Sequence, residues 1–349
     1  MGSNTNKRKS AKRGVLIALV VFLSIVLVVL LAGTIFMSRF LNSIVKVDPN
    51  QETMSQEQID AILNEETEAT DPDFTGEAIS SDDVHLSDTP VDTVETSDDV
   101  LNILLVGQDT EDLSQRSRSD SMILCTINKS TGTLTMTSFM RDMYVKIPEF
   151  YDQRMNVAYL LGGFDALYDT LEHNFGVQVD KGVAVNFASF QKVIDAVGGV
   201  EIELTAAEAN HLNMQNYTWG LFEGVNILTG ETALAYSRIR ALGGDFDRTN
   251  RQRTVMMALL DKAKDMPLTD LYNLVEALIP MVVTDMSNSE IIVAAMELAP
   301  MLQNLEIVSQ RVPVDDGYYM TMVDGMSVLL PDLEVNREFL VDTIGIDKN

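Results

Sequence analysis

Cysteine and histidine are scarce in this sequence, and their scarcity excludes several kinds of active site. The 349 residues include a single cysteine and three histidines. One cysteine cannot form an intramolecular disulfide or a cysteine-based metal cage. His85, His173 and His211 are scattered without ligand spacing, which argues against a Ser-His-Asp triad or a histidine-based zinc site. Cys125 lies in the apolar run MILCTI, so we expect a buried, inert thiol.

Positive charge is also in short supply, with 25 Lys and Arg against 52 Asp and Glu and a formal net charge of −27. Nucleic acid is therefore not expected as a partner, because binding its backbone requires clustered cations. At 349 residues the chain is long enough to bury a sizeable core in one large or two ordinary domains. Arginines that do cluster in so acidic a chain are correspondingly informative.

Residues 14–37 carry no charge and directly follow KRKSAKR, a run with five cations. A helix of this length would measure about 36 Å, enough to cross a bilayer. Cations before the span place residues 1–13 in the cytoplasm and the rest of the chain outside the cell. The alternative is a cleavable signal peptide, but its apolar region would be about 7–15 residues long. The sequence MSRF after the span also lacks a small-x-small cleavage site, so we expect a single-pass, uncleaved membrane anchor.

Residues 38–100 are predicted to form a mostly disordered acidic linker. Between Asp48 and Asp99 there are seventeen acidic residues and no Lys or Arg, with many Ser and Thr. Such a segment cannot bury enough apolar surface to offset the entropy lost on ordering its chain. The apolar spacing in QEQIDAILNEE allows one short helix within it. Weak calcium binding is an alternative use of the carboxylates, but a solvated linker is the expected state.

The remaining residues, 101–349, have the pattern of one α/β domain. LNILLVGQD is typical of a buried strand ending at Asp109, and SMILCTINKSTGTLTMTSF of two strands joined by a turn at residues 128–132. A helix is predicted at residues 156–174, followed by the strand VAVNF, the helix ASFQKVIDAVGG and the strand VEIEL. This alternation predicts a sheet with helices on both faces. Ligands of such sheets bind beyond the carboxyl ends of strands, where Asp109 and Arg141 fall.

The second half of this domain is predicted to be mainly helical. Residues 206–228 look irregular, and TGETALAY is a short helix capped at Thr229. Three helical segments rich in Met, Leu, Val and Ala follow, at residues 252–264, 269–283 and 289–302. LEIVSQRVP is a late strand and VNREFLVDTI a closing helix. We find no internal repeat and no second globular unit.

The stretch AYSRIRALGGDFDRTNRQR concentrates arginines in this acidic chain. If YSRIR is extended, Arg238 and Arg240 lie on one face of the strand. A helix beginning near Arg248 would put Arg248, Arg251 and Gln252 on a common face. Two guanidinium clusters beside a helix N-terminus would bind phosphate or diphosphate. The alternative is a solvated basic helix face.

Seven motifs in a fixed order resemble a known family. They are NILLVGQD, RSRSDSM, SFMRDMYVKIP, MNVAYLLGG, VIDAVGGVEIEL, LTGETALAYSRIR and GGDFDRTNRQR. The chain is similar, from residue 102 to about residue 345, to the LytR–CpsA–Psr family of cell-wall polymer ligases. The resemblance implies an α/β/α sandwich with a central mixed sheet and a long polyprenyl-phosphate tunnel. It also implies a phosphotransferase that moves a glycopolymer, of teichoic acid or capsular polysaccharide type, from a polyprenyl-diphosphate carrier onto peptidoglycan.

The resemblance assigns roles to individual residues. Asp109 and Asp120 match the family's magnesium-binding aspartates, a site that Mn²⁺ could also take. Its phosphate-binding arginines are matched by Arg118, Arg141, Arg238 and Arg240, and its last motif by Arg248, Arg251 and Gln252. The catalytic set implied is Asp109, Asp120, Arg141, Arg238 and Arg240. One departure is Asn186 in VAVNF, where the family usually has an aspartate.

The implied reaction needs little covalent help from the protein. An acceptor sugar hydroxyl attacks the glycan-bearing phosphorus and expels polyprenyl phosphate, so catalysis consists of charge neutralisation and alignment. Asp109 or Asp120 could take the hydroxyl proton. The Met-rich helices after Gln252 and the sheet face could form the lipid groove, although core packing explains these Met residues equally well. The alternatives are a hydrolase with water as acceptor and a membrane-anchored regulator, but the short cytoplasmic tail has no helix-turn-helix pattern.

Overall fold

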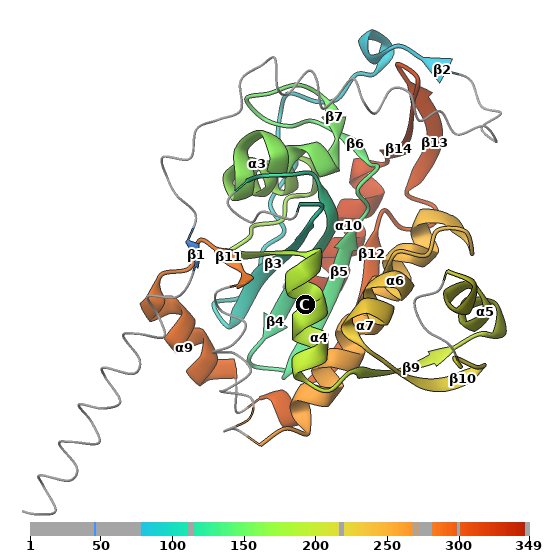
Figure 1. Ribbon diagram of the computed structural model, residues 1–349. Helices are drawn as coiled ribbons and strands as arrows, with labels where there is room; N and C mark the ends of the chain where they lie inside the picture. Colours follow the sequence, from blue (N-terminus) through green and yellow to red (C-terminus); the bar gives the residue numbers. More distant parts are fainter. Residues whose placement is uncertain are drawn as a thin grey trace, which may run out of the picture. The chain divides into compact units, whose positions relative to one another are not determined.

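The computed structural model of the protein is shown in Figure 1. The chain divides into two units, Met1–Ile44 and Val45–Asn349, and the described residues all belong to the second. The structure describes residues 45–46, 78–110, 115–215, 220–267, 270, 281–298 and 301–345. The predicted membrane anchor at residues 14–37 lies outside these ranges. Within them, no helix has the length and apolar character needed to cross a membrane.

A seven-stranded mixed sheet forms the centre of the described domain (Figure 1). Its order is β1-β11-β8-β3-β4-β5-β12. β4 is antiparallel to β3 and β5, whereas β8 is parallel to β3 and β12 is parallel to β5. The strands are β1 (Val45–Lys46), β3 (Val100–Gln108), β4 (Ser119–Asn128), β5 (Thr133–Phe139), β8 (Lys181–Asn186), β11 (Val283–Thr284) and β12 (Glu306–Val312). The predicted central mixed sheet is therefore confirmed.

The turn between β4 and β5 forms where the sequence predicted it. Asn128 Oδ1 accepts hydrogen bonds from the backbone N–H groups of Ser130 and Thr131, both at 3.1 Å. Gly132 donates its N–H to the Asn128 carbonyl and has a φ of 71°, a conformation that glycine adopts at little cost. This local chemistry fixes the register of the two strands.

Helices cover both faces of the sheet, as predicted (Figure 1). Alternate strand residues point to opposite faces, so Leu124 packs in a cluster with Leu167, whereas Ile123 packs in another with Met256. Cys125 belongs to the second cluster, and burial raises the pKa of its thiol to about 12. One face carries α3 (Ala158–Phe175) and α10 (Leu333–Ile344), and the other carries α7 (Gly244–Lys264) and α9 (Asn288–Leu298).

Residues 206–214 and 224–228 form a helix and a strand, which corrects the prediction that residues 206–228 are irregular. Thr205 and Glu208 form a capping box, in which each side chain accepts the other's backbone N–H, at 3.2 and 3.0 Å. This box starts a helix, and the strand after it pairs antiparallel with VEIEL outside the main sheet. The elements are β9 (Val200–Leu204), α5 (Ala206–Met214) and β10 (Gly224–Leu228). The spacing T-x-x-E signalled this helix in the sequence.

Helices α4 (Phe187–Ala196) and α6 (Gly230–Ser237) share a separate apolar cluster with this ribbon and with α7. The Asn186 side chain caps α4 by accepting the Ser189 N–H at 2.9 Å. Thr229 caps α6, as predicted. The cluster therefore holds α4 and α6 beside the sheet, where they border the cavity described below.

The sequence analysis missed one hairpin, β13 (Tyr318–Val323) and β14 (Met326–Pro331). Asp324 and Gly325 join its strands with φ values of 48° and 83°. Asp-Gly between two apolar runs is a strong hairpin signal, because both turn residues need positive φ. The predicted late strand and closing helix are present as β12 and α10. Most of the helix predicted at residues 269–283 lies outside the described residues.

The predicted disordered linker is wrong for its last part, because residues 78–99 pack on the domain. Val94 is buried, and its N–H bonds to the Gly176 carbonyl at 2.8 Å. Val91 donates to the His173 carbonyl at 3.0 Å, and β2 (Ala78–Ile79) pairs with β13. The prediction rested on the acidic composition of the whole segment, which does not reveal the few apolar residues that contact the domain. The domain therefore begins before residue 100.

Candidate active site

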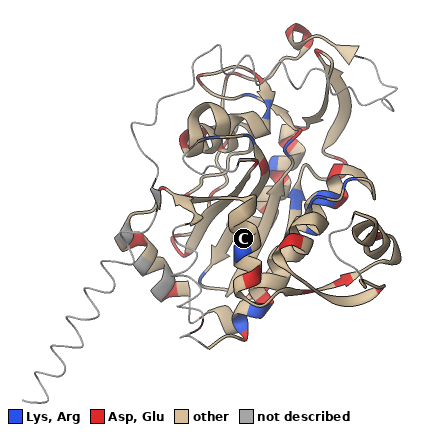
Figure 2. Ribbon diagram, in the orientation of Figure 1, with Lys and Arg blue, Asp and Glu red and all other residues tan. Residues whose placement is uncertain are grey.

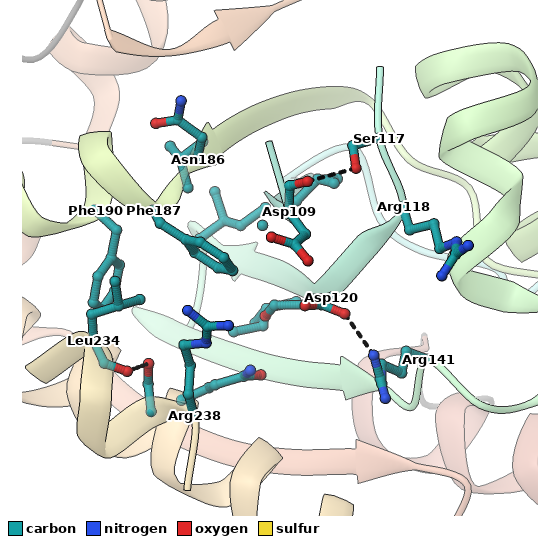
Figure 3. A pocket seen from close by; sticks show the side chains of 18 of the residues that line it. Asp109, Ser117, Arg118, Asp120, Arg141, Asn186, Phe187, Phe190, Leu234 and Arg238 are labelled. Carbon is teal, nitrogen blue, oxygen red and sulfur yellow. Dashed lines mark hydrogen bonds and ion pairs between the residues drawn. The ribbon is translucent and has the colours of Figure 1, made fainter. Parts of the chain in front are cut away.

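A cavity of about 780 Å³ lies between the sheet and helices α4, α6 and α7 (Figure 3). Its wall changes character along several of the elements that form it. On α7, the lining runs from Arg248 and Gln252 to Met256 and Leu259. The inner wall is apolar and includes Leu105, Ile123, Val183, Val185, Phe190, Val193 and Leu234. The mouth is lined by Asp109, Arg116, Arg118, Asp120, Arg141, Arg238, Arg240 and Arg248.

The mouth lies at one edge of the sheet, where several strands end or begin. Asp109 follows β3, and Arg141 comes two residues after β5. Asp120 is near the start of β4, which runs in the opposite direction, so it lies at the same edge. Asn186 ends β8, which is parallel to β3. The predicted position of Asp109 and Arg141 at the carboxyl ends of strands is therefore confirmed.

Hydrogen bonds hold the loop between β3 and β4 against the strand end. Ser117 Oγ donates to the Asp109 carbonyl at 2.8 Å (Figure 3), and the Asp109 N–H bonds to the Arg118 carbonyl at 3.3 Å. The Ser117 N–H also donates to Gln108 Oε1 at 3.2 Å. These contacts fix the backbone at Asp109 and Arg118 while both side chains line the cavity.

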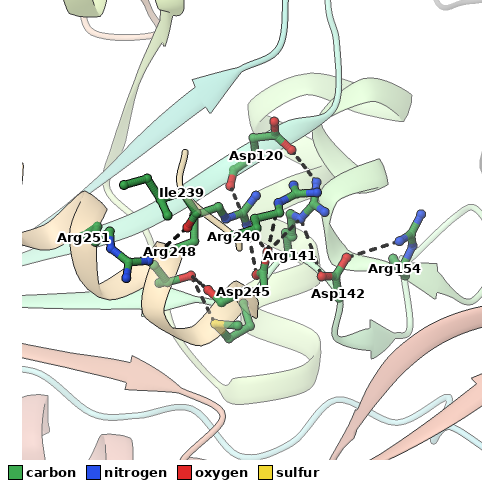
Figure 4. A network of polar contacts seen from close by, with 11 residues as sticks. Asp120, Arg141, Asp142, Arg154, Ile239, Arg240, Asp245, Arg248 and Arg251 are labelled. Atoms are coloured by element: carbon green, nitrogen blue, oxygen red, sulfur yellow. Dashed lines mark hydrogen bonds and ion pairs between the residues drawn. The ribbon is translucent and has the colours of Figure 1, made fainter. Parts of the chain in front are cut away.

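Arg141 is surrounded by three carboxylates (Figure 4). Its Nη1 lies 2.7 Å from Asp120 Oδ1, and its Nε lies 3.6 Å from both Asp142 and Asp245. Burial alone would lower the pKa of Arg141, but these carboxylates outweigh it and the pKa is raised. Burial raises the pKa of Asp142, and the nearby Asp245 carboxylate raises it further. Arg141 is therefore firmly charged and held in place.

Asp245, which the sequence analysis did not select, joins three of the arginines (Figure 4). Its carboxylate lies 2.8 Å from Arg248 Nη2, 3.6 Å from Arg141 Nε and 3.9 Å from Arg240 Nε. Burial lowers the pKa of Arg248, and Asp245 opposes this effect. The spacing of Asp245 and Arg248, three residues apart in one helix, was a usable signal in the sequence.

Arg238 and Arg240 both line the cavity, although not for the predicted reason. The segment YSRIR is not extended: α6 continues to Ser237, and Arg238 is its C-cap, with φ −106° and ψ 0°. α7 begins at Gly244 rather than near Arg248, after Gly243 with a φ of 105°. The tight turn between the two helices brings both guanidinium groups to the mouth.

Arg251 lies outside the cavity lining, which corrects its assignment to phosphate binding. Its Nε bonds to Glu208 Oε1 at 2.7 Å, and its Nη1 and Nη2 bond to the carbonyls of Ile239 and Leu242 at 3.0 and 2.7 Å. Each of the three guanidinium nitrogens is thus hydrogen-bonded within the protein. It braces the α6–α7 turn rather than facing a ligand.

Comparison with known proteins identifies the group to which this architecture belongs. The model of the LytR_cpsA_psr family matches residues 70–340. The chain belongs to this family. The resemblance seen in the sequence is thereby confirmed, and the match also begins before residue 100.

Relatives in the LytR_cpsA_psr family include several named transferases. The chain is 37% identical over 167 residues to the polyisoprenyl-teichoic acid–peptidoglycan teichoic acid transferase TagU of Bacillus licheniformis, covering 47% of this chain and 52% of that protein. It is 29% identical over 250 residues to TagU of Halalkalibacterium halodurans, covering 69% and 78%. The chain spans about half the length of the first curated relatives it matches.

Solved structures of the family share the fold. TagT bound to LIIa-WTA is 25% identical, with a TM-score of 0.59, and covers 75% of this chain and 100% of that chain. The family protein YwtF (TagT) with bound octaprenyl pyrophosphate lipid is also 25% identical, with a TM-score of 0.56 and the same coverage.

Further cavity residues of this family member were not predicted as site residues. Arg116 lines the mouth, and its Nη1 lies 3.4 Å from the Leu161 carbonyl of α3. Phe187 and Phe190 of α4 line the cavity, and the Arg238 guanidinium carbon lies 4.4 Å from the Phe187 ring centroid. Asn186 lines it too and caps α4, a task for which Asn and Asp serve equally well. The hydrophobic periodicity of the sequence predicted that α4 packs on the sheet. It did not show which side chains contact the rings of Phe187 and Phe190.

Asp109 and Asp120 are the two carboxylates of the cavity mouth that could hold a metal ion. Both line the same cavity, and Asp120 uses Oδ1 for Arg141. Among the described residues, no group of three or more His, Cys, Asp or Glu side chains could hold a metal ion. Two carboxylates that need further oxygens from a bound phosphate group fit Mg²⁺, which commonly binds through one or two carboxylates plus substrate phosphates.

The charge around the mouth differs from that of the chain as a whole. Six arginines and two aspartates line the cavity in a chain with a net charge of −27. Figure 2 shows basic residues gathered at the start of α7, whereas acidic residues are spread over helices and loops. A positive mouth that opens into an apolar cavity fits an amphipathic ligand with an anionic head.

Proposed function

We propose that this protein transfers a glycopolymer, of teichoic acid or capsular polysaccharide type, from a polyprenyl-diphosphate carrier onto peptidoglycan. The observation that carries the proposal is a cavity that combines an arginine-lined mouth with an apolar interior. A diphosphate matches the mouth, because guanidinium groups bind phosphate oxygens in bidentate pairs. A polyprenyl chain matches the interior wall of strands β3, β4 and β8 with helices α4 and α7.

The reaction follows from the position of the charged groups. The oxygen of an acceptor sugar hydroxyl attacks the phosphorus that carries the glycan, and a new phosphodiester bond forms. The anhydride bond to the second phosphorus breaks, and polyprenyl phosphate leaves with the bond's electron pair. Arg118, Arg141, Arg238, Arg240 and Arg248 hold the phosphates and offset the charge that develops on the leaving oxygen. Gln252, one helical turn after Arg248, offers an amide to the same head group.

The hydroxyl proton passes to a carboxylate at the mouth. Asp109 suits this role because it is exposed and lines the cavity, whereas Asp120 is bonded to Arg141 at 2.7 Å. Asp109 and Asp120 would also hold Mg²⁺ or Mn²⁺, which would supply positive charge at the diphosphate oxygens. The arginines position the phosphates in either case.

The membrane topology is part of this proposal. Residues 14–37 would span the cell membrane once, with residues 1–13 in the cytoplasm and the catalytic domain outside, where peptidoglycan is located. Protease added to intact wall-less cells should then digest the domain and spare the N-terminal tail. A domain that stays protected until the cells are lysed would contradict the extracellular assignment.

The proposed reaction can be tested with the full-length chain in detergent, a polyprenyl-diphosphate-linked glycan and purified peptidoglycan. We expect covalently attached glycan, and polyprenyl phosphate released in equal amount. Arg238→Gln provides the inactive control. Release of free glycan without attachment would show a hydrolase instead, and no reaction with any carrier would refute the proposal.

A further inference from the structure

Phe187 lies at the boundary between the charged mouth and the apolar interior of the cavity. It is the first residue of α4, directly after the capping residue Asn186, and its side chain is half-buried. The guanidinium carbon of Arg238 lies over its ring, 4.4 Å from the centroid. Both residues line the cavity, which places this cation–π contact inside the site.

Arg238 is held differently from the neighbouring arginines. Arg141 is bonded to Asp120 at 2.7 Å, and Arg248 is paired with Asp245 at 2.8 Å. Within the part of the chain that the structure describes, Arg238 has no carboxylate partner, and the Phe187 ring is its close contact. A carboxylate would cancel the charge of the guanidinium, whereas a ring attracts the cation without neutralising it.

We propose that Phe187 is a positioning residue that aims Arg238 at the diphosphate. The inference rests on the proposed function, because it assigns Phe187 a part in binding the anionic head of the carrier. It also accounts for an aromatic residue at the point where the wall changes from charged to apolar. Phe187, in the first turn of α4, thereby orients the diphosphate head group through Arg238. Phe190, one turn later, begins the surface that faces the lipid.

The test measures binding of two probes, inorganic diphosphate and octaprenyl diphosphate, to the full-length chain in detergent. Phe187→Leu should weaken binding of both probes about 3- to 30-fold, the range expected for loss of a cation–π contact. Phe187→Tyr, which keeps the ring, should restore affinity to within about twofold of the parent. Melting temperatures show that each variant is folded, and Phe187→Met is a second ring-free variant if Phe187→Leu does not fold.

A double-mutant cycle separates positioning from simple packing. In an Arg238→Gln background, Phe187→Leu should have almost no further effect on inorganic diphosphate, because the ring acts through Arg238. Phe190→Leu is the matched control: it removes a ring from the same wall without touching Arg238. Its effect on octaprenyl diphosphate should be the same factor in both backgrounds.

The outcomes distinguish this inference from the proposed function. If the parent binds neither probe, the proposed function fails. If the parent binds both and Phe187→Leu binds them equally well, the positioning role is overturned while the function stands. An effect of Phe187→Leu that is just as large in the Arg238→Gln background would also overturn it, since the ring would then act by packing alone.

Discussion

Asp245→Asn should destabilise the protein and yet increase its affinity for diphosphate. Asp245 is the carboxylate shared by Arg141, Arg240 and Arg248. Replacing it with the isosteric amide leaves the shape of the site intact but removes the negative charge between three cations. The guanidinium groups then repel one another until an added anion takes the place of the carboxylate.

The three contacts do not contribute equally. The pair with Arg248 has a separation of 2.8 Å and side chains only 4% and 20% exposed, so breaking it should cost about 3 kcal/mol, the low end for a buried pair. The Arg240 side chain is 51% exposed and its Nε lies 3.9 Å from Asp245, so this contact contributes little to stability. Arg141 keeps Asp120 and Asp142 as partners. For a domain of this size, about 3 kcal/mol lowers the melting temperature by roughly 6–12 °C.

The assay combines thermal unfolding with titration of inorganic diphosphate. Removing one negative charge beside the phosphates should increase affinity about fivefold at low salt, with a smaller gain at high salt. Diphosphate should therefore raise the melting temperature of Asp245→Asn more than that of the parent. Glu290→Gln is a suitable control, because Glu290 forms a similarly short but more exposed ion pair with Lys181, at 2.7 Å. Glu290→Gln should change neither the melting temperature nor the affinity for diphosphate appreciably.

Two results would refute the reasoning. A parental melting temperature for Asp245→Asn would show that the arginines need no internal counter-ion. Weaker diphosphate binding by the folded variant would show that Asp245 orients the arginines more than it neutralises them.

Three further predictions concern other charged residues. Arg238→Lys and Arg240→Lys should each lower glycan transfer at least about tenfold with little change in melting temperature, since Lys cannot form bidentate contacts; parental transfer rates would make both residues surface charges. Mg²⁺ should raise the melting temperature of the full-length chain, more so with octaprenyl diphosphate, and Asp120→Ala should abolish this shift and the transfer together; an unchanged shift would rule out Asp120 as a ligand. Burial raises the pKa of Glu208, but hydrogen bonds from Thr205 and Arg251 outweigh it, so the folded-state pKa is lowered. The resulting stabilisation is complete above the unfolded pKa of about 4.3 and is lost as pH falls through the folded value. Urea unfolding should therefore show the stability gap between the parent and Glu208→Gln closing as pH falls from about 7 to about 3, and a constant gap would contradict this cause.

Local sequence patterns were reliable where a short segment determines its own conformation. The turn at Asn128–Gly132 is set by an Asx hydrogen bond and a glycine with positive φ, and both are readable from the residues. Thr229 begins α6 for a similar local reason. The capping box at Thr205 and the Asp324-Gly325 turn carried equally local signals, which the sequence analysis did not use.

Charge composition misled the analysis where a few apolar residues decide the outcome. The acidic segment before residue 100 has the average composition of a disordered linker. Burial of Val94 and hydrogen bonds to the end of α3 nevertheless attach its last part to the domain. Average composition does not reveal such contacts, because their partners lie about eighty residues further along the chain.

The sequence by itself determined most strands and helices of the central sheet and the placing of charged residues at strand ends, because hydrophobic period and capping are local properties. The order of its motifs indicated the family. The tertiary structure decided which of these residues share the cavity. Helical spacing allowed Arg248, Arg251 and Gln252 to lie on one face, but Glu208 of α5 draws Arg251 away from the cavity. Asp245 among the arginines and Phe187 beside Arg238 depend in the same way on how α4, α6 and α7 pack. The hydrophobic period of a helix or strand shows which of its side chains share a face. Only the packing of the elements determines which residues that face contacts.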